Sequence, residues 1–194
     1  MPETRTRRRL PEAERRRVIL DAATDVVAAH GAEAASISAI ASRAGITRPI
    51  VYDHFPSKQH LILALIEEHH ATLMGVLGSI AIGPRLDKKI LRRVLVAYLH
   101  QVDEDPGGWR ILCLEQSRDP AIAEVQRRTA AEVNTVVAQM LNPTRPLKDR
   151  LIVVEAARAA VNALADLRQQ DPSVEIETLA DAAVALLWDG LHRF

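Results

Sequence analysis

The chain has 194 residues and a formal net charge of zero, with 48% hydrophobic and 26% charged residues. This composition is typical of a globular protein that is long enough to form a sizeable core. Because Cys113 is the only cysteine, no disulfide can form within one chain, and a reducing cytoplasm is the expected location. We expect no signal peptide, since no apolar segment follows the early arginines, and no membrane span, since charges interrupt the longest apolar stretches.

Basic residues are concentrated at the start of the chain. The first 17 residues contain seven Arg and three Glu, although the whole chain balances 25 basic against 25 acidic residues. A basic segment on a neutral chain suggests contact with a polyanion such as nucleic acid. A solvated tail without a partner explains it equally well. In either case, we expect residues 1–10 to form a basic flexible arm.

The first two predicted elements are helices. Residues 11–30 carry apolar side chains at spacings of three and four, which predicts an amphipathic helix with Gly31 just after its end. Ser36 is a favourable N-cap for a short second helix, ISAIASRA. Gly45 can adopt the left-handed conformation that ends this helix.

The next two elements are also predicted to be helices. Thr47 is expected to cap a short third helix, with Pro49 in its first turn, where the missing N–H costs little. Pro56 ends this helix. Ser57 is expected to cap a long fourth helix that runs from residue 58 to about residue 79.

After Gly83-Pro84, the second part of the chain also follows a helical period. Turns rich in Pro and Gly divide it into five predicted helices, at about 86–104, 107–117, 120–141, 147–170 and 174–192. No segment alternates as a half-buried strand does. The sequence therefore predicts an all-α fold of about nine helices, with a three-helix domain at residues 11–57 and a ligand-binding and dimerisation bundle at residues 58–194.

The segment from Ser36 to Phe55 has the pattern of a helix-turn-helix. Its two short helices flank Gly45-Ile46-Thr47, and their apolar and small residues can pack against the first long helix. In this motif the second helix enters the major groove of DNA, and its first residues reach base edges. Other three-helix corners can use similar residues, so the bare pattern is only moderately specific.

The outward-facing residues of the second short helix favour DNA binding. Arg48 stands at the start of this helix, and its guanidinium suits the O6 and N7 atoms of guanine. Pro49 and Tyr52 lie beside it, and Tyr52 suits either a thymine methyl group, a phosphate or simple packing. We expect phosphate contacts from a second set of residues, of which the first two also serve as helix caps: Ser36, Thr47, His54 and Lys58.

The segment SISAIASRAGITRPIVYDHFPSKQHLILAL resembles the N-terminal domain of the tetracycline-repressor (TetR) family. The residues that carry the resemblance are Ser36, Ile40-Ala41, Ala44-Gly45-Ile46-Thr47, Tyr52, His54-Phe55, Ser57-Lys58 and Leu61. Ser36 stands where Thr is more usual, and Asp53 places a negative charge near the groove-facing side. The resemblance covers about residues 11–65.

Membership of that family implies a ligand-responsive DNA-binding regulator, most simply a repressor that binds a palindromic operator as a dimer and is released by a small ligand. It also implies nine or so helices, an inducer pocket in the C-terminal bundle, and homodimerisation through the last two helices. The predicted helices at 147–170 and 174–192 have wide apolar faces with small residues, which suits a four-helix bundle made by two subunits. The alternative is that these faces serve only the core of the monomer.

The residues that bind the effector are less clear from the sequence. Our candidates are Trp109, Arg110 and Cys113, with Arg110 available to an acidic head group. The competing interpretations are that Arg110 ties two helices together through Glu115 or Asp103, and that Cys113 is a small core residue. With 3% aromatic residues, we expect an aliphatic pocket for a hydrophobic ligand, such as a fatty acid or acyl thioester.

Two other classes of protein are alternatives to a DNA-binding regulator. An enzyme is disfavoured because the chain has no P-loop, dinucleotide fingerprint, nucleophile elbow or metal-ligand spacing. His69 and His70 are adjacent, so their side chains point about 100° apart on a helix and cannot easily share one metal ion. We therefore expect no cofactor and no metal. The other alternative is a helical small-molecule-binding or scaffold protein that does not bind DNA.

Overall fold

A computed structural model describes residues 11–80, 86–114, 117–141 and 143–191, and all regular structure in these residues is helical. The expected basic arm at residues 1–10 lies outside them. The helices are α1 (Glu12–His30), α2 (Ile37–Arg43), α3 (Arg48–His54), α4 (Lys58–Ile80), α5 (Lys88–Glu104), α6 (Pro106–Trp109), the π-helical turn η1 (Arg110–Leu114), α7 (Pro120–Gln139), α8 (Leu147–Gln170) and α9 (Ile176–Leu191). The predicted all-α fold is confirmed.

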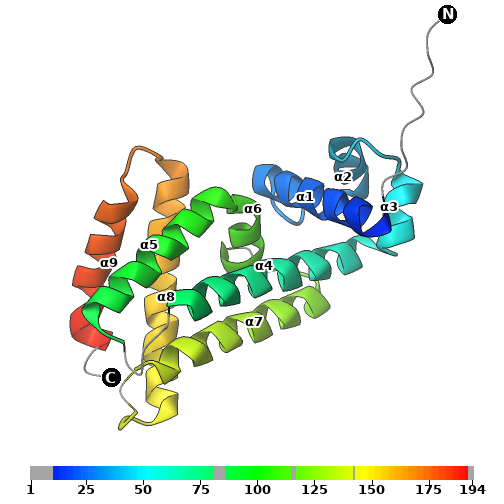
Figure 1. Cartoon of the computed structure of the whole chain (residues 1–194). Helices are drawn as coiled ribbons and strands as arrows, with labels where there is room; N and C mark the ends of the chain where they lie inside the picture. The colour runs from blue at the N-terminus through cyan, green and yellow to red at the C-terminus, as the bar shows by residue number, and fades with distance from the viewer. Residues whose placement is uncertain (1–10, 81–85, 115–116, 142, 192–194) are drawn as a thin grey trace, which may run out of the picture.

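Figure 1 shows how these helices are arranged. Helices α1, α2 and α3 form a small group at one end, and α4 leads from this group into a larger bundle. Helix α7 lies alongside α4, while α5, α8 and α9 pack together at the opposite end. The short α6 lies between α1 and the bundle, and it contacts α1, α4 and α5.

Two apolar cores support this arrangement, and their boundary does not coincide with the predicted domain boundary at residue 57. The first core joins α1–α3 to the first half of α4, where Leu61 and Ile66 are fully buried, and it also includes Ile111 of η1 and Ile122 of α7. The second core joins α5, α8 and α9. The start of α4 is therefore packed firmly against α1–α3, because close-packed cores resist deformation.

The predicted helix at 107–117 differs from the structure. Pro106 begins α6, and Asp105 caps it by accepting a hydrogen bond from the N–H of Gly108. The chain then changes to a π-helical turn, η1, over residues 110–114. Periodicity over such a short stretch cannot distinguish an α-helix from a wider turn. The two glycines at the start of α6 lie too close to Thr24, His69 and Asp105 to carry a Cβ atom.

Helix α4 is long and largely apolar. Over Lys58–Ser79 it is long and apolar enough to cross a membrane by length and composition, although Glu67 and Glu68 interrupt the stretch as expected. Its residues Leu61, Ile62, Leu65 and Ile66 are at most 1% exposed within the first core. The core helix of a soluble protein meets the same length and composition test, and the first half of α4 packs in the first core.

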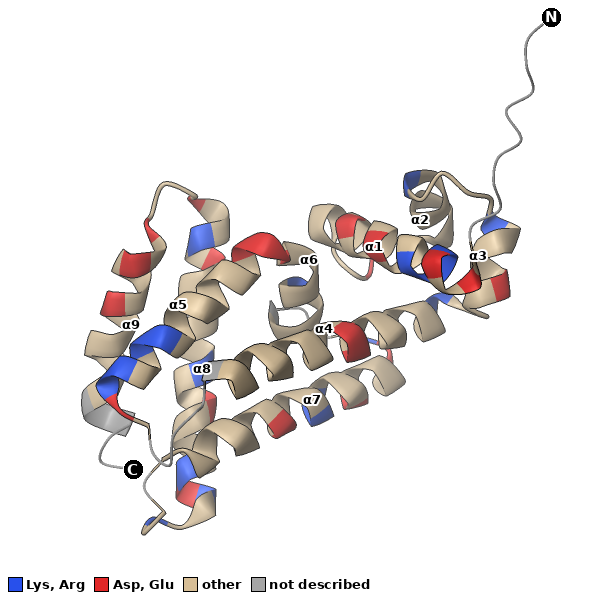
Figure 2. Cartoon of the chain, in the orientation of Figure 1, with Lys and Arg blue, Asp and Glu red and all other residues tan. Residues whose placement is uncertain are grey.

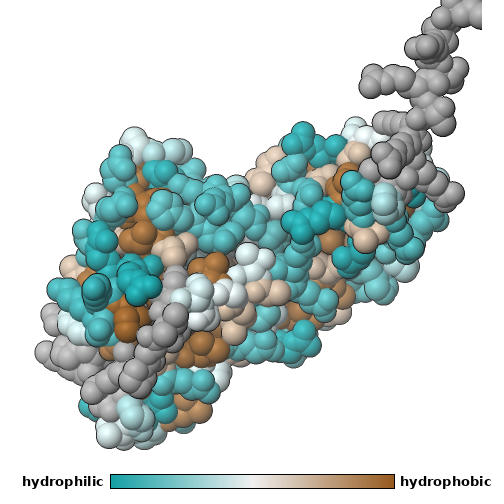
Figure 3. All heavy atoms as spheres, in the orientation of Figure 1, coloured by the Kyte–Doolittle hydropathy of each residue, from teal (hydrophilic) through white to brown (hydrophobic). Residues whose placement is uncertain are grey.

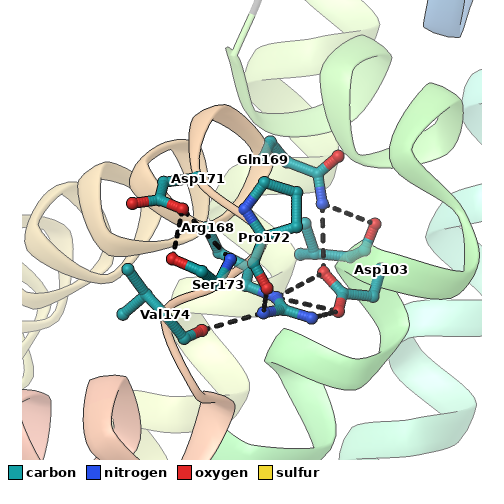
Figure 4. A network of polar contacts seen from close by, with 8 residues as sticks. Asp103, Arg168, Gln169, Asp171, Pro172, Ser173 and Val174 are labelled. Atoms are coloured by element: carbon teal, nitrogen blue, oxygen red, sulfur yellow. Dashed lines mark hydrogen bonds and ion pairs between the residues drawn. The ribbon is translucent and has the colours of Figure 1, made fainter.

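A polar network fixes the end of α8 to α5 (Figure 4). The guanidinium of Arg168 donates to both carboxylate oxygens of Asp103, with the shortest contact at 2.7 Å, and to the backbone carbonyl of Val174 at 2.8 Å. Gln169 adds a hydrogen bond to Asp103 at 3.1 Å. Because one guanidinium serves both α5 and the turn before α9, it sets the direction in which α9 leaves α8.

Candidate DNA interface and effector cavity

The turn between α2 and α3 has the geometry predicted for it. Gly45 has a φ of 65°, the left-handed conformation that favours glycine. The N–H of Gly45 donates to the carbonyl of Ser42 at 3.2 Å, and the N–H of Ile46 donates to Ala41 at 3.0 Å. These two bonds close the end of α2 and allow α3 to start three residues later.

Two of the three helix caps predicted around this turn are present in the structure. The hydroxyl of Ser36 accepts from the N–H of Ala39 at 3.1 Å, and that of Ser57 accepts from the N–H of His60 at 3.2 Å. Thr47 precedes α3, but its side chain makes no capping hydrogen bond, so that part of the prediction is wrong. Pro49 lies in the first turn of α3, as predicted, and it leaves one fewer N–H there to satisfy.

Helix α3 presents one face to the core and the other to solvent. Val51 is fully buried against α1 and α2, and Phe55 just after the helix is 3% exposed. Arg48 and Pro49 are exposed, and Tyr52 is 43% exposed. The structure thus brings the three predicted base-reading residues to the open side of one two-turn helix. Figure 2 shows that basic and acidic residues are interspersed on α1, whereas α4 is largely uncharged.

The predicted phosphate-binding residues lie at the edges of this face. Ser36 and Thr47 are exposed, and His54 is partly exposed at the end of α3. Lys58 begins α4, and its ammonium group donates to the backbone carbonyl of Glu33 at 2.8 Å. An ammonium group carries three hydrogens, so two donors of Lys58 remain for other acceptors.

Two contacts that we did not predict hold α1 against this motif. The guanidinium of Arg43 in α2 binds the carboxylate of Asp25 in α1 at 2.6 Å. The guanidinium of Arg16 lies over the ring of Phe55, 5.0 Å from its centroid. The sequence alone offers no sign that Arg43 pairs with Asp25 or that Arg16 lies over an aromatic ring.

Behind these helices, the bundle encloses an apolar cavity of about 140 Å³. Its wall is built by α4, α5, η1, α7, α8 and α9, and it consists mainly of Leu, Val and Ala side chains. The predicted residue Cys113 lies in this wall. Figure 3 shows the outside of the molecule, where hydrophilic residues dominate the visible face and apolar patches appear in the bundle.

Most polar side chains in the cavity wall are already bound by the protein. The hydroxyl of Tyr98 donates to Asn162 at 2.6 Å, and the imidazole of His70 lies 2.9 Å from the carboxylate of Glu132. Burial raises the pKa of the Tyr98 hydroxyl well above its usual value, so the group stays neutral. The wall is therefore largely apolar, and the guanidinium of Arg158 in it is paired with Glu155.

Asn134 is different from these residues. Its Nδ2 atom donates to the carboxylate of Glu155 at 2.6 Å, and this fixes the orientation of the amide because a carboxylate can only accept. The Oδ1 atom is then buried, and in the described residues it has no hydrogen-bond partner. A hydroxyl or N–H group brought close to it would satisfy this acceptor.

Two of the three predicted ligand-binding residues lie outside the cavity wall. Trp109 is 5% exposed, belongs to the second core and lines a separate space of about 30 Å³ with Cys113. The guanidinium of Arg110 donates to the backbone carbonyl of Ala28 at 2.9 Å, because η1 turns its side chain toward the end of α1. Arg110 does tie two helices together, but Asp103 is not its partner, since Asp103 binds Arg168. Glu115 lies outside the described residues.

His69 and His70 of α4 are each bound to a carboxylate. His69 lies against Asp105 and His70 against Glu132, on different sides of the helix. In the part of the chain that the structure describes, no three His, Cys, Asp or Glu side chains are grouped as a metal site would require.

Comparison with known proteins decides between the classes of protein that share this architecture. Residues 19–65 match the model of the bacterial regulatory proteins of the tetR family. The HTH-type transcriptional activator FasR of Mycolicibacterium smegmatis is 28% identical over 95% of this chain and 86% of its own length. A TetR-like transcriptional regulator from Rhodococcus sp. RHA1 superposes with a TM-score of 0.79 at 29% identity, over 94% of this chain and 98% of the other.

Residues 19–65 belong to the TetR family of DNA-binding domains, and the whole chain is similar to TetR-family regulators. It is a DNA-binding transcriptional regulator, and its helix-turn-helix is the pair α2 and α3. A more distant structure has the same fold: the regulator FadR of Bacillus subtilis in complex with stearoyl-CoA, with a TM-score of 0.74 at 16% identity, over 91% of this chain and 99% of that one. The cavity is lined in part by α4, and α4 also packs on α1.

Proposed function

We propose that this TetR-family regulator is a cytoplasmic homodimeric repressor, which binds a palindromic operator and is released by a ligand with a long aliphatic part. The observation that carries the DNA-binding half of the proposal is the division of α3 into two faces. Val51 is buried, while Arg48, Pro49 and Tyr52 stand on the open side of the same helix. Arg48 at its start is placed to read a guanine edge.

The phosphate contacts in this proposal come from the residues around α3. The hydroxyls of Ser36 and Thr47, the imidazole of His54 and the remaining donors of Lys58 would bind the backbone of the DNA and set the docking angle. The basic arm at residues 1–10 would add sequence-independent attraction. The division into an arm, a DNA-binding domain at 11–57 and a ligand-binding and dimerisation domain at 58–194 belongs to the same proposal.

The proposed dimer interface is the outer face of α8 and α9. The inner faces of these helices pack on α7 and α5, yet large apolar side chains remain exposed on both. Ile152 and Leu167 of α8 are 61% and 45% exposed, and Leu186 of α9 is 67% exposed. Apolar side chains gathered on a helix pair of this kind indicate a partner, and an isologous contact between two copies buries them on both sides.

The proposed ligand follows from the chemistry of the cavity. Its wall is almost entirely aliphatic, which suits an acyl chain better than a planar cation. The stearoyl-CoA bound by the Bacillus subtilis regulator is a molecule of this kind. Asn134 Oδ1 supplies an acceptor for a single donor group near the chain. A ligand that prefers one position of α4 would change the spacing of the two α3 helices in the dimer, and with it the affinity for DNA.

The competing hypothesis is a helical ligand-binding or scaffold protein that binds no DNA, and a gel shift separates the two. The probe is the DNA upstream of the gene, at stated salt, with and without palmitoyl-CoA or a planar cationic dye. The proposal expects a sequence-specific shift that palmitoyl-CoA weakens and the dye does not. A chain that binds this DNA no better than scrambled DNA would favour the competing hypothesis, and release by the dye alone would overturn the acyl ligand.

The sign of regulation needs a separate measurement, because the Mycolicibacterium smegmatis relative is an activator. A reporter gene placed behind the shifted DNA should be transcribed less when the chain is present, and palmitoyl-CoA should restore transcription. Higher transcription in the presence of the chain would show activation instead. We propose regulation without catalysis, and purified chain should return palmitoyl-CoA unchanged.

A further inference from the structure

The start of α6 lies unusually close to α1 and α4. A Cβ atom on Gly107 would overlap the backbone carbonyl of Thr24 in α1, and one on Gly108 would overlap the side chains of His69 and Asp105. The overlap at Gly107 cannot be relieved by a side-chain rotation, since the Thr24 carbonyl oxygen belongs to the backbone. The two adjacent glycines therefore allow α6 to touch α1 on one side and α4 on the other.

His69 fills the point at which these three helices meet. Its Nδ1 atom lies 2.5 Å from the carboxylate of Asp105 at the start of α6, and its Nε2 atom lies 3.1 Å from the hydroxyl of Thr24 in α1. Only 13% of the His69 side chain is exposed. The other carboxylate oxygen of Asp105 accepts from the N–H of Gly108 at 2.9 Å, so one carboxylate both caps α6 and holds the imidazole.

The hydrogen bonds of Thr24 settle the direction of this contact. The Thr24 hydroxyl has one hydrogen, which it donates to the carbonyl of Leu20 at 3.1 Å within α1. It therefore accepts from Nε2–H of His69. A carboxylate can only accept, so the Nδ1 atom also donates. His69 therefore bridges α1 and α6 through its two ring nitrogens.

The next residue along α4 faces the cavity. His70 lies in the cavity wall and bonds Glu132 of α7, while His69 points about 100° away toward α1 and α6. Consecutive residues of one helix cannot move independently, because both are held by the same backbone hydrogen bonds. A displacement of α4 at the cavity wall is therefore a displacement of the His69 imidazole against α1.

We propose that the contact of His69 with Thr24 and Asp105 is the joint through which occupancy of the cavity sets the position of α1 and hence of α3. Gly107 and Gly108 allow the close approach of the helices that this contact requires. This inference rests on the proposed function, in that a ligand occupies the cavity. His69 is a positioning residue, since it touches neither the cavity nor DNA. Removal of the joint leaves both binding activities in place and disconnects them from each other.

The test uses two substitutions of Thr24 in the full chain. Thr24→Val keeps the volume but has no hydroxyl to accept from His69, whereas Thr24→Ser keeps the hydroxyl and is the matched control. The operator is selected from random DNA with the wild-type chain, and its Kd is measured by fluorescence anisotropy with and without saturating palmitoyl-CoA. The ratio of the two Kd values measures the coupling, which is about 5- to 150-fold in typical allosteric proteins.

We expect Thr24→Ser to keep the wild-type ratio and Thr24→Val to bring it close to one, with the Kd for each partner alone within about threefold of wild type. A folding defect would instead weaken both Kd values together and lower the Tm. A wild-type ratio in Thr24→Val would overturn the joint. His69→Gln should resemble Thr24→Val, since a Gln side chain has one amide end and cannot reach both partners.

A second arm separates failure of the joint from failure of the acyl ligand. Ala157→Phe fills the cavity from α8 with the chain's own side chain, so it replaces the ligand. Its effect on the Kd for the operator, and on amide exchange in peptides from α1, should disappear when Thr24→Val is added. If palmitoyl-CoA has no effect but Ala157→Phe does, the acyl ligand is wrong and the joint stands. If neither changes the operator Kd or α1 exchange, the joint is wrong.

Discussion

The ammonium group of Lys58 donates a 2.8 Å hydrogen bond to the backbone carbonyl of Glu33, and so ties the first residue of α4 to the turn after α1. This contact places the charge of Lys58 at the junction of the helix-turn-helix and the helix that enters the bundle. A residue in this position supports the junction and has donors left, which we propose bind a DNA phosphate.

Lys58→Ala should therefore weaken binding to all DNA sequences by a similar factor. Loss of one phosphate contact should reduce the slope of log Kd against log salt by about 1. The measurement is a salt titration by fluorescence anisotropy on operator and scrambled DNA. Lys89→Ala on α5 is the control, since Lys89 is exposed and distant in sequence from the motif. A loss confined to the operator would instead assign a base-reading role to Lys58.

Cys113 reports directly on the cavity because it is the only thiol in the chain. Burial raises the pKa of this thiol, so little thiolate is present at neutral pH. Alkylation by N-ethylmaleimide at pH 7.5 should be about tenfold or more slower than in the urea-unfolded chain. Palmitoyl-CoA should slow it further, as followed by mass spectrometry. Alkylation that palmitoyl-CoA leaves unchanged would place the ligand elsewhere.

The proposed dimer interface can be broken with one charge. Leu186→Glu puts a carboxylate on the exposed apolar face of α9, and an unpaired carboxylate buried between two copies is strongly unfavourable. Light scattering should show a monomer, and operator affinity should fall by roughly 10²-fold because two linked half-sites are lost. Ala121→Glu, an exposed position on α7, is the control. A Leu186→Glu variant that remains dimeric would move the interface away from α9.

The pH dependence of stability should include a contribution from Asp105. Burial raises the pKa of this carboxyl, but the hydrogen bond and charge of His69 and the N–H of Gly108 outweigh burial and hold the pKa below 3.8. Because the pKa is lower in the folded chain, the stabilisation is complete above the unfolded pKa and is lost as pH falls through the folded one. Urea unfolding between pH 3 and pH 6 checks this.

Asp105→Asn should lower the free energy of unfolding at pH 6 by about 1.5–3 kcal/mol, because it removes a hydrogen bond to a charged partner. The difference from wild type should shrink as pH falls below about 4. A difference that is constant over the whole range would show that Asp105 contributes through packing alone.

Local signals in the sequence predicted the DNA-binding motif well. Ser36 caps α2 and Gly45 adopts a positive φ, since both depend on a few neighbouring residues. Thr47 lacks the expected capping bond although it precedes α3, because a residue type allows a cap without imposing one. The π-helical turn at residues 110–114 was missed, and with it the direction in which Arg110 points.

The cavity and the joint at His69 could not be predicted in the same way. The residues involved come from helices far apart in the sequence, and periodicity shows which face of a helix is apolar but not which helix covers it. Tyr98, Asn134 and Asn162 did offer a signal, since each is a polar residue within an apolar helical face. Gly107-Gly108 offered another, because two glycines at a helix start indicate close approach as well as a turn.

The base-reading role of Arg48 is the most direct test of the account, and fluorescence anisotropy of Arg48→Ala on the selected operator measures it. We expect a loss of about 1–3 kcal/mol, or roughly 5- to 150-fold in Kd, on the operator, with little change on scrambled DNA and an unchanged Tm. Arg127→Ala, on the exposed side of α7, should bind as wild type does. An Arg48→Ala variant that keeps both the affinity and the sequence preference of the wild-type chain would contradict the account.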